Sequence, residues 1–228
     1  MLTAEEMKAY KSGVGKALYL VKISRPDLSN AVRELAQQSN KATQMHMKAL
    51  HTLLKYTIDS KESGIIIHSN KKGPFKIMAY ADSDYANDTD TRHSVTGYLI
   101  YVNSSLVCWK SKLQPCTALS STEAEYIAIS MCLTDMLFLK QLCEDAGFEV
   151  SLPMEIYSDN TGAISMCNNP PGGRTKHVDI KYHHIKDHVD NGNVIVCYVG
   201  SRYNLADPFT KNVAQNVFYS HLRYLIND

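Results

Sequence analysis

FKIMAYAD, at residues 75–82, alternates its side chains between two faces, as a β-strand does, and this alternation indicates the fold class. One face carries Ile77, Ala79 and Ala81, and the other carries Met78, Tyr80 and Asp82. Residues 95–102 are β-branched and aromatic, Asn103–Ser104 suits a tight turn, and residues 106–109 suit a returning strand. The chain therefore predicts three consecutive strands in a meander.

Patterns on either side of this meander predict a mixed sheet with helices packed on it. Further strands are expected at 65–67, 154–158 and 194–199, and helices at about 14–21, 26–35, 43–58, 120–146, 162–167, 176–189 and from Pro208 to the C-terminus. Ser24 is expected to cap the helix that starts at Pro26. The run NKKGP at 70–74 predicts a linker. We expect a helical segment over residues 1–70 and an α/β (α+β mixed-sheet) domain over residues 71–228.

Length and composition restrict the classes of protein. With 228 residues, of which 44% are hydrophobic, the chain can bury a sizeable core. A net charge of +1 excludes a globally basic nucleic-acid binder. Six scattered cysteines without a Cys-x-x-Cys pair argue against zinc ribbons and disulfide scaffolds, and they favour a reducing compartment. The polar N-terminus is unlike a signal peptide, and no apolar run approaches the roughly 20 residues of a membrane span, so we expect no membrane partner.

Four carboxylates stand where predicted strands or helices meet loops: Asp82, Glu125, Asp159 and Asp207. Apolar or small residues flank each of them, and burying a carboxylate is costly unless a cation shares the site. Four such groups at one edge of a sheet would suit hard divalent cations, and a pair of such ions can cut a phosphodiester. The four acids are therefore the candidate catalytic and metal-binding residues.

Each acid also has a simpler interpretation. Asp159 and Asp207 precede helices and could serve only as N-caps, and the aspartates after residue 82 are ordinary turn formers. Glu123 competes with Glu125 but lies nearer the Ser120 cap, where a capping role suits it better. Glu125 instead begins an apolar helical stripe, so it needs a partner, and a metal ion could be one.

Seven motifs resemble the ribonuclease H domain of copia-type LTR retrotransposon polyproteins. In unbroken order over about residues 75–212 they are AYADSDYA, RHSVTGYLIYV, WKSKLQP, ALSSTEAEYIA, IYSDNTGAI, RTKHVDIKYHHI and YNLADPFTK. Residues 10–66 resemble the thumb or connection at the end of the preceding reverse transcriptase. The resemblance implies a ribonuclease H-like five-stranded mixed sheet flanked by helices.

The resemblance also implies an activity. Asp82, Glu125, Asp159 and Asp207 match the four catalytic, metal-binding acids of the family. They would hold two Mg²⁺ ions, with Mn²⁺ as a substitute, and hydrolyse the RNA strand of an RNA–DNA hybrid during reverse transcription. The remaining reverse transcriptase domains are the implied partners. The implied location is the cytoplasm, within virus-like particles, or the nucleus.

Basic residues are candidates for contact with a nucleic-acid backbone. They are Lys110, Lys112, Arg174, Lys176, His177 and Lys181. Plain solvated surface explains the stretch from Arg174 to Lys181 equally well, and a zinc site at His184 and His188 lacks a third ligand. A second hypothesis for the whole chain is a non-catalytic, domesticated module that binds nucleic acid or a polymerase partner without cutting.

Overall fold

The computed structural model describes residues 2–68, 73–88, 91–169 and 184–227. These residues form two compact units. The helical unit comprises Met1–Ile66 and Asn212–Asp228, and the sheet unit comprises Ile67–Lys211. The helical unit is therefore built from two separate parts of the chain, with the sheet unit inserted between them.

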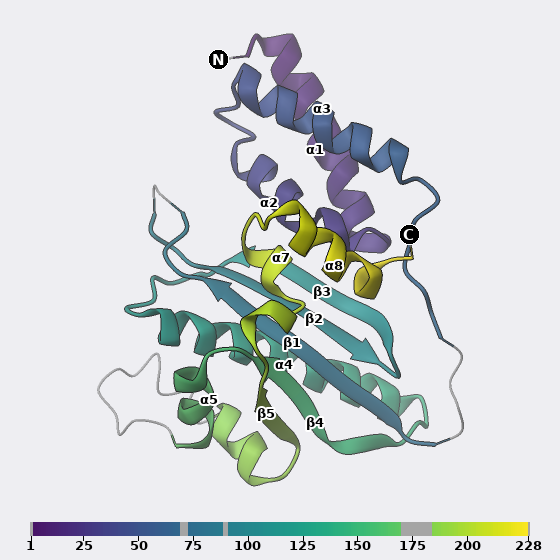
Figure 1. The fold of residues 1–228 in the computed structure, drawn as a ribbon, viewed down its shortest axis with the longest axis vertical. Coiled ribbons are helices and arrows are strands. Elements are labelled where there is room, and N and C mark those ends of the chain that lie inside the picture. The colour runs from purple at the N-terminus through teal and green to yellow at the C-terminus, as the bar shows by residue number, and fades with distance from the viewer. Residues whose placement is uncertain (1, 69–72, 89–90, 170–183, 228) are drawn as a thin grey trace. The chain divides into compact units, whose positions relative to one another are not determined.

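The sheet unit has five strands in the spatial order β3-β2-β1-β4-β5 (Figure 1). The strands are β1 (Phe75–Asp84), β2 (Val95–Val102), β3 (Ser105–Leu113), β4 (Val150–Ser158) and β5 (Val194–Tyr198). β1, β2 and β3 form the predicted antiparallel meander, whereas β4 pairs with β1 and β5 in parallel. The predicted mixed sheet is confirmed, and β3 continues beyond the predicted residues 106–109.

Helix α4 (Ser121–Asp145) covers one face of this sheet (Figure 1). Ile77, Ala79 and Ala81 are fully buried on that face, as the alternation in β1 predicts. The Ser120 side chain caps α4 at its start, and Gly147, with φ of +83°, lies just beyond its end. Among the described residues α4 alone is long and apolar enough to cross a membrane, and its packing on the sheet accounts for that composition.

The opposite face of the sheet receives α7 (Asp207–Thr210), which lies over β1 and β2 (Figure 1). Gly97 makes this close approach possible, since a Cβ there would lie 2.8 Å from the Phe209 Cβ. The smaller elements of this unit are α5 (Thr161–Asn168), a helical stretch at residues 184–190, and the 3-10 turn η2 (Ser201–Tyr203).

The helical unit consists of α1 (Ala4–Ile23), η1 (Pro26–Leu28), α2 (Ser29–Gln37), α3 (Gln44–Asp59) and α8 (Gln215–Leu225). Its apolar core includes Tyr10, Val14 and Leu50. Arg25 and Asp27 form a buried ion pair at 2.8 Å, and the Tyr56 hydroxyl donates to the same aspartate.

Three expectations about these elements need correction. Residues 65–67 form no strand. The second helix starts at Ser29, because Pro26 begins a 3-10 turn, and Ser24 ends α1 instead of capping a new helix. The boundary expected near residue 70 is close to the observed one, but Asn212–Asp228 groups with the N-terminal helices and not with the sheet. Of the helix expected at 176–189, residues 176–183 lie outside the described part of the chain.

Candidate metal centre

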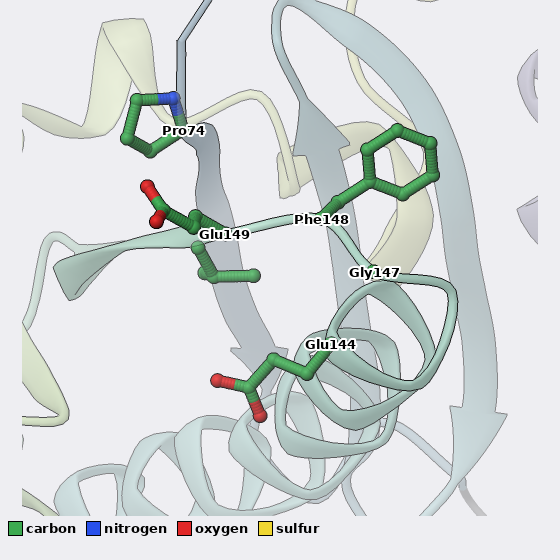
Figure 2. A pocket seen from close by; sticks show the side chains of 6 residues that line it. Pro74, Glu144, Gly147, Phe148 and Glu149 are labelled. Atoms are coloured by element: carbon green, nitrogen blue, oxygen red, sulfur yellow. The ribbon is translucent and has the colours of Figure 1, made fainter.

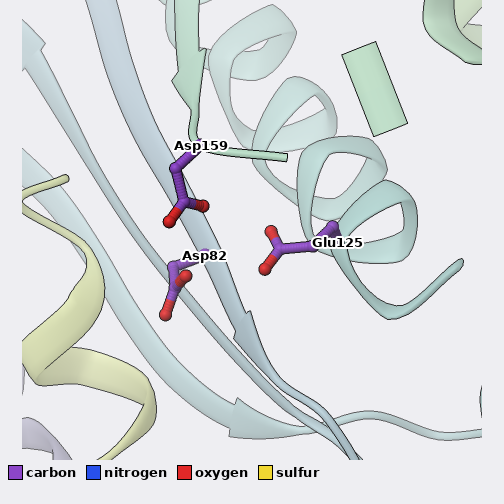
Figure 3. A group of neighbouring side chains, drawn as sticks. All are labelled: Asp82, Glu125 and Asp159. Atoms are coloured by element: carbon purple, nitrogen blue, oxygen red, sulfur yellow. The ribbon is translucent and has the colours of Figure 1, made fainter. Parts of the chain in front are cut away.

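Three of the four predicted carboxylates meet at one end of the sheet (Figure 3). Asp82 comes from β1, Asp159 follows the last residue of β4, and Glu125 projects toward both from the beginning of α4. One oxygen of each carboxylate lies within 4.8 Å of an oxygen of the other two. We call Asp82, Glu125 and Asp159 the acidic cluster.

The local fold explains why these acids converge. β1 and β4 are parallel neighbours, with Tyr80 opposite Tyr157, so their carboxyl ends reach the same edge of the sheet. Asp159 does not cap α5, because the Asn160 side chain accepts the capping hydrogen bond from the Ala163 N–H at 2.9 Å. The interpretation of Asp159 as a mere helix cap is therefore wrong.

The competition between Glu123 and Glu125 is settled by their contacts. Glu123 accepts a hydrogen bond from the Leu119 N–H at 2.7 Å, so it serves the start of α4 as a capping residue. Glu125 is 6% exposed and points into the acidic cluster. The structure thus brings together the glutamate that heads the apolar stripe.

Burial gives the acidic cluster unusual electrostatics. Burial, with the charges of Asp82 and Asp159 adding to it, raises the pKa of Glu125 to about 9. Burial also raises the pKa of Asp82 to about 6, although a hydrogen bond from the Thr210 hydroxyl works in the opposite direction. Both carboxyls therefore hold protons more tightly than ordinary acids do, which is the behaviour of a site that lacks a countercharge.

The acidic cluster fits a hard divalent cation. One Glu125 oxygen accepts the Ser83 N–H at 3.2 Å, but its second oxygen is buried without a hydrogen-bond partner in the described protein. A buried acceptor without a partner is costly, and a cation would satisfy it. Three carboxylate oxygens at this spacing suit Mg²⁺, Mn²⁺ or Ca²⁺, whereas softer metals prefer sulfur or imidazole ligands.

Comparison with known proteins identifies the family. The chain is 36% identical over 216 residues to the retrovirus-related Pol polyprotein from transposon RE2 of Arabidopsis thaliana, covering 94% of this chain and 15% of that protein. It is 34% identical over 210 residues to the corresponding polyprotein from transposon TNT 1-94 of Nicotiana tabacum, covering 92% and 16%. The chain belongs to the copia-type retrotransposon Pol family. It spans about one sixth of the length of these relatives.

Other comparisons add shorter or weaker similarities to this Pol-family chain. A secreted RxLR effector protein of Plasmopara viticola is 38% identical over 130 residues, covering 57% of this chain and 90% of that protein. A solved ribonuclease H1 from compost, LC11, superposes with a TM-score of 0.44 at 18% identity, covering 64% of this chain and 98% of that one. No protein-family model matches the chain.

Asp207, the fourth acid of the Pol-family motifs, lies outside the acidic cluster as defined by the 4.8 Å spacing. It is the first residue of α7, and its carboxylate binds the Lys211 ammonium at 2.7 Å. Its charge still raises the pKa of Asp82, so the two carboxylates are electrostatic neighbours. The structure therefore brings three predicted acids together and places the fourth beside them in an ion pair.

The predicted nucleic-acid contacts are only partly described. The Lys110 ammonium lies 3.0 Å from Asp135 and over the Tyr98 ring, so it is engaged within the sheet unit. Lys112 is exposed and stays a candidate. The other four, Arg174, Lys176, His177 and Lys181, lie outside the described residues.

Two residues that contact the acidic cluster were not predicted. Thr210 donates its hydroxyl to Asp82, and Ser83 donates its backbone N–H to Glu125. The first could have been found, because Thr210 is one helical turn after Asp207 and must lie on the same side of α7. The second is a backbone contact and leaves no mark in the choice of side chain.

A separate pocket of about 470 Å³ lies at the far end of α4 (Figure 2). Pro74, Glu144 and residues 147–150 line it. Glu144 follows Glu125 by 19 residues in the same helix, which corresponds to about 28 Å along the axis. This pocket therefore takes no part in the chemistry of the acidic cluster.

Proposed function

We propose that this Pol-family chain is a metal-dependent ribonuclease H that hydrolyses the RNA strand of RNA–DNA hybrids. The observation that carries the proposal is the acidic cluster, in which a buried Glu125 oxygen has no protein partner. Membership of the retrotransposon Pol family supports it, since seven motifs of the chain resemble the ribonuclease H part of such polyproteins.

In this proposal the chain holds divalent cations through the acidic cluster, with Asp207 as a further ligand for a second ion. When bound, such cations lower the pKa of a water molecule and stabilise charge on the leaving oxygen. Thr210 orients Asp82 through its hydroxyl, and the Ser83 N–H holds one oxygen of Glu125, which leaves the other free. Contacts to 2′-hydroxyl groups would direct cleavage to the RNA strand.

The proposal is tested with a hybrid whose RNA strand is labelled, incubated with the chain and Mg²⁺ or Mn²⁺. We expect RNA fragments from the hybrid, none in EDTA, and no cleavage of single-stranded RNA or duplex DNA. Asp82→Asn should abolish cleavage. Asp145→Asn is the matched control, because it makes the same chemical change at the exposed end of α4 and should leave cleavage unchanged.

A non-catalytic nucleic-acid-binding module is the second candidate. The observation in its favour is the ion pair between Asp207 and Lys211, which occupies the fourth acid with a cation from the same chain. A chain that binds the hybrid but leaves its RNA intact with either metal ion would establish this candidate and refute the nuclease. Full activity of Asp82→Asn would also refute the proposed site.

A further inference from the structure

Gln114 joins two elements beside the acidic cluster. It follows the last residue of β3, and its backbone N–H donates to the Ser94 carbonyl at 2.8 Å. The side chain is almost fully buried, with 1% of its surface exposed. Its amide nitrogen donates to the Thr96 hydroxyl at 3.0 Å and to the Ala124 carbonyl at 2.9 Å. A single amide therefore connects β2 with the first turn of α4.

The second of these bonds acts on the residue that precedes Glu125. Ala124 is fully buried, and its carbonyl belongs to the rigid helical backbone that carries the glutamate. The Glu125 carboxylate has only one hydrogen bond of its own, from the Ser83 N–H. Its position consequently depends on where the first turn of α4 rests on the sheet.

The other contacts at the start of α4 do not supply this connection. Ser120 and Glu123 bond to backbone groups of residues 119–123, so they define where the helix begins but do not attach it to a strand. Gln114 and the Ser83 N–H are the printed hydrogen bonds that run from the described strands and their ends to the Ala124–Glu125 segment.

The position of Gln114 is an unfavourable one for an amide. Ala118, Ala124 and Ile127 form a small apolar cluster around this part of α4, and the Gln114 carbonyl oxygen is buried without a hydrogen-bond partner in the described protein. An apolar side chain of the same size would avoid this penalty. An amide whose donors are both used and whose acceptor is not suits a role in holding its two partners.

We propose that Gln114 is a positioning residue that holds the first turn of α4, and with it Glu125, at the height over the sheet at which the acidic cluster binds a divalent cation. The inference rests on the proposed function. Residues that orient metal ligands typically change metal affinity 10- to 100-fold when they are replaced. Ligands must also be held to within about 0.5 Å of their productive geometry.

The test compares Mn²⁺ binding to the whole chain and to two variants, measured by the electron paramagnetic resonance of free Mn²⁺ without substrate. Gln114→Met keeps the length of the side chain and removes both hydrogen bonds, and we expect its dissociation constant to rise at least 10-fold. Thr96→Val is the matched control, because it removes one partner of the amide and leaves the bond to Ala124. Its dissociation constant should stay within about threefold of the wild type.

Thermal unfolding and kinetics separate positioning from plain structural support. Both variants lose a buried hydrogen bond, so both should unfold at a lower temperature. Gln114→Met should also need more Mn²⁺ for half-maximal cleavage, with an unchanged KM for the hybrid. If it does not fold, Gln114→Asn retains the amide on a shorter side chain and should bind Mn²⁺ more weakly as well.

Two outcomes would overturn the inference. If both variants unfold earlier but bind Mn²⁺ as the wild type does, Gln114 is only structural, and the proposed nuclease function is unaffected. If the wild type neither binds Mn²⁺ nor cleaves the hybrid, the proposed function and this inference fail together.

Discussion

Replacing Glu125 by glutamine should stabilise the metal-free protein and at the same time remove its response to divalent cations. Glutamine has the same shape and can still accept the Ser83 N–H, but it carries no charge. In the metal-free wild type, burial and the neighbouring acids raise the pKa of Glu125 to about 9. In the unfolded chain the same carboxyl has its ordinary value of 4.5 and is ionised at pH 7.

The size of the gain follows from this difference. A group whose pKa is raised in the folded state contributes full stability below its unfolded pKa, and the contribution is lost as the pH rises toward the folded pKa. At about 1.4 kcal/mol per pH unit, the interval from 4.5 to neutral pH gives about 3 kcal/mol. Because Asp82 shares part of this penalty, we expect Glu125→Gln to raise the free energy of unfolding by about 1–3 kcal/mol at pH 7.

Urea denaturation in EDTA and in Mn²⁺ measures both effects. In EDTA, wild-type stability should fall between pH 5 and 8 more steeply than that of the variant. Mn²⁺ at about 100 times its dissociation constant should stabilise the wild type by about 2.7 kcal/mol and the variant much less. Glu123→Gln is the control, because it alters a capping residue and should keep the metal response. A Glu125→Gln protein less stable than wild type in EDTA at pH 8, or stabilised equally by Mn²⁺, would refute the reasoning.

Three further predictions concern the same unit. Mn²⁺ affinity should increase from pH 6 to 9, because binding displaces protons that the acidic cluster holds with raised pKa values; calorimetry in two buffers counts the released protons, and a pH-independent affinity would contradict this. Gly97→Ala should lower the free energy of unfolding by about 2 kcal/mol, because the new methyl group meets Phe209; Gly15→Ala, where nothing lies within 4 Å, is the control and should lose no stability in urea. Tyr98→Phe removes a 2.6 Å hydrogen bond to Asp135 and should cost about 1.5 kcal/mol in the same assay, so a loss below about 0.3 kcal/mol would show that the bond is unimportant.

The fold was largely predictable because its strands alternate clearly. The burial of Ile77, Ala79 and Ala81 in β1 and the turn at Asn103–Ser104 follow directly from residue type. The start of the second helix was missed because Pro26 suits a 3-10 turn as well as an α-helix. The grouping of α8 with the N-terminal helices could not be predicted, because the pattern of an amphipathic helix says that one face is buried but not against which partner.

The candidate site was predictable in part for similar physical reasons. Asp82 and Asp159 end parallel neighbouring strands, so their convergence follows once the strand order is known. The ion pair between Asp207 and Lys211 was not foreseen, although the two residues are spaced by one helical turn. The Gln114 amide bonds across ten residues to Ala124, and contacts of this kind depend on tertiary packing that a local pattern does not contain.

The discontinuous helical unit has a practical consequence for anyone who dissects this protein. A truncation after residue 70 would leave α8 attached to the sheet but would take away the helices that it packs with, including the Tyr56 ring beside Phe218. The orphaned apolar face of α8 would then invite aggregation, and an inactive fragment could be mistaken for an inactive nuclease. Isolating the sheet requires two cuts, one on each side of residues 67–211, whereas the uncut chain keeps both ends of the polypeptide within one folded body.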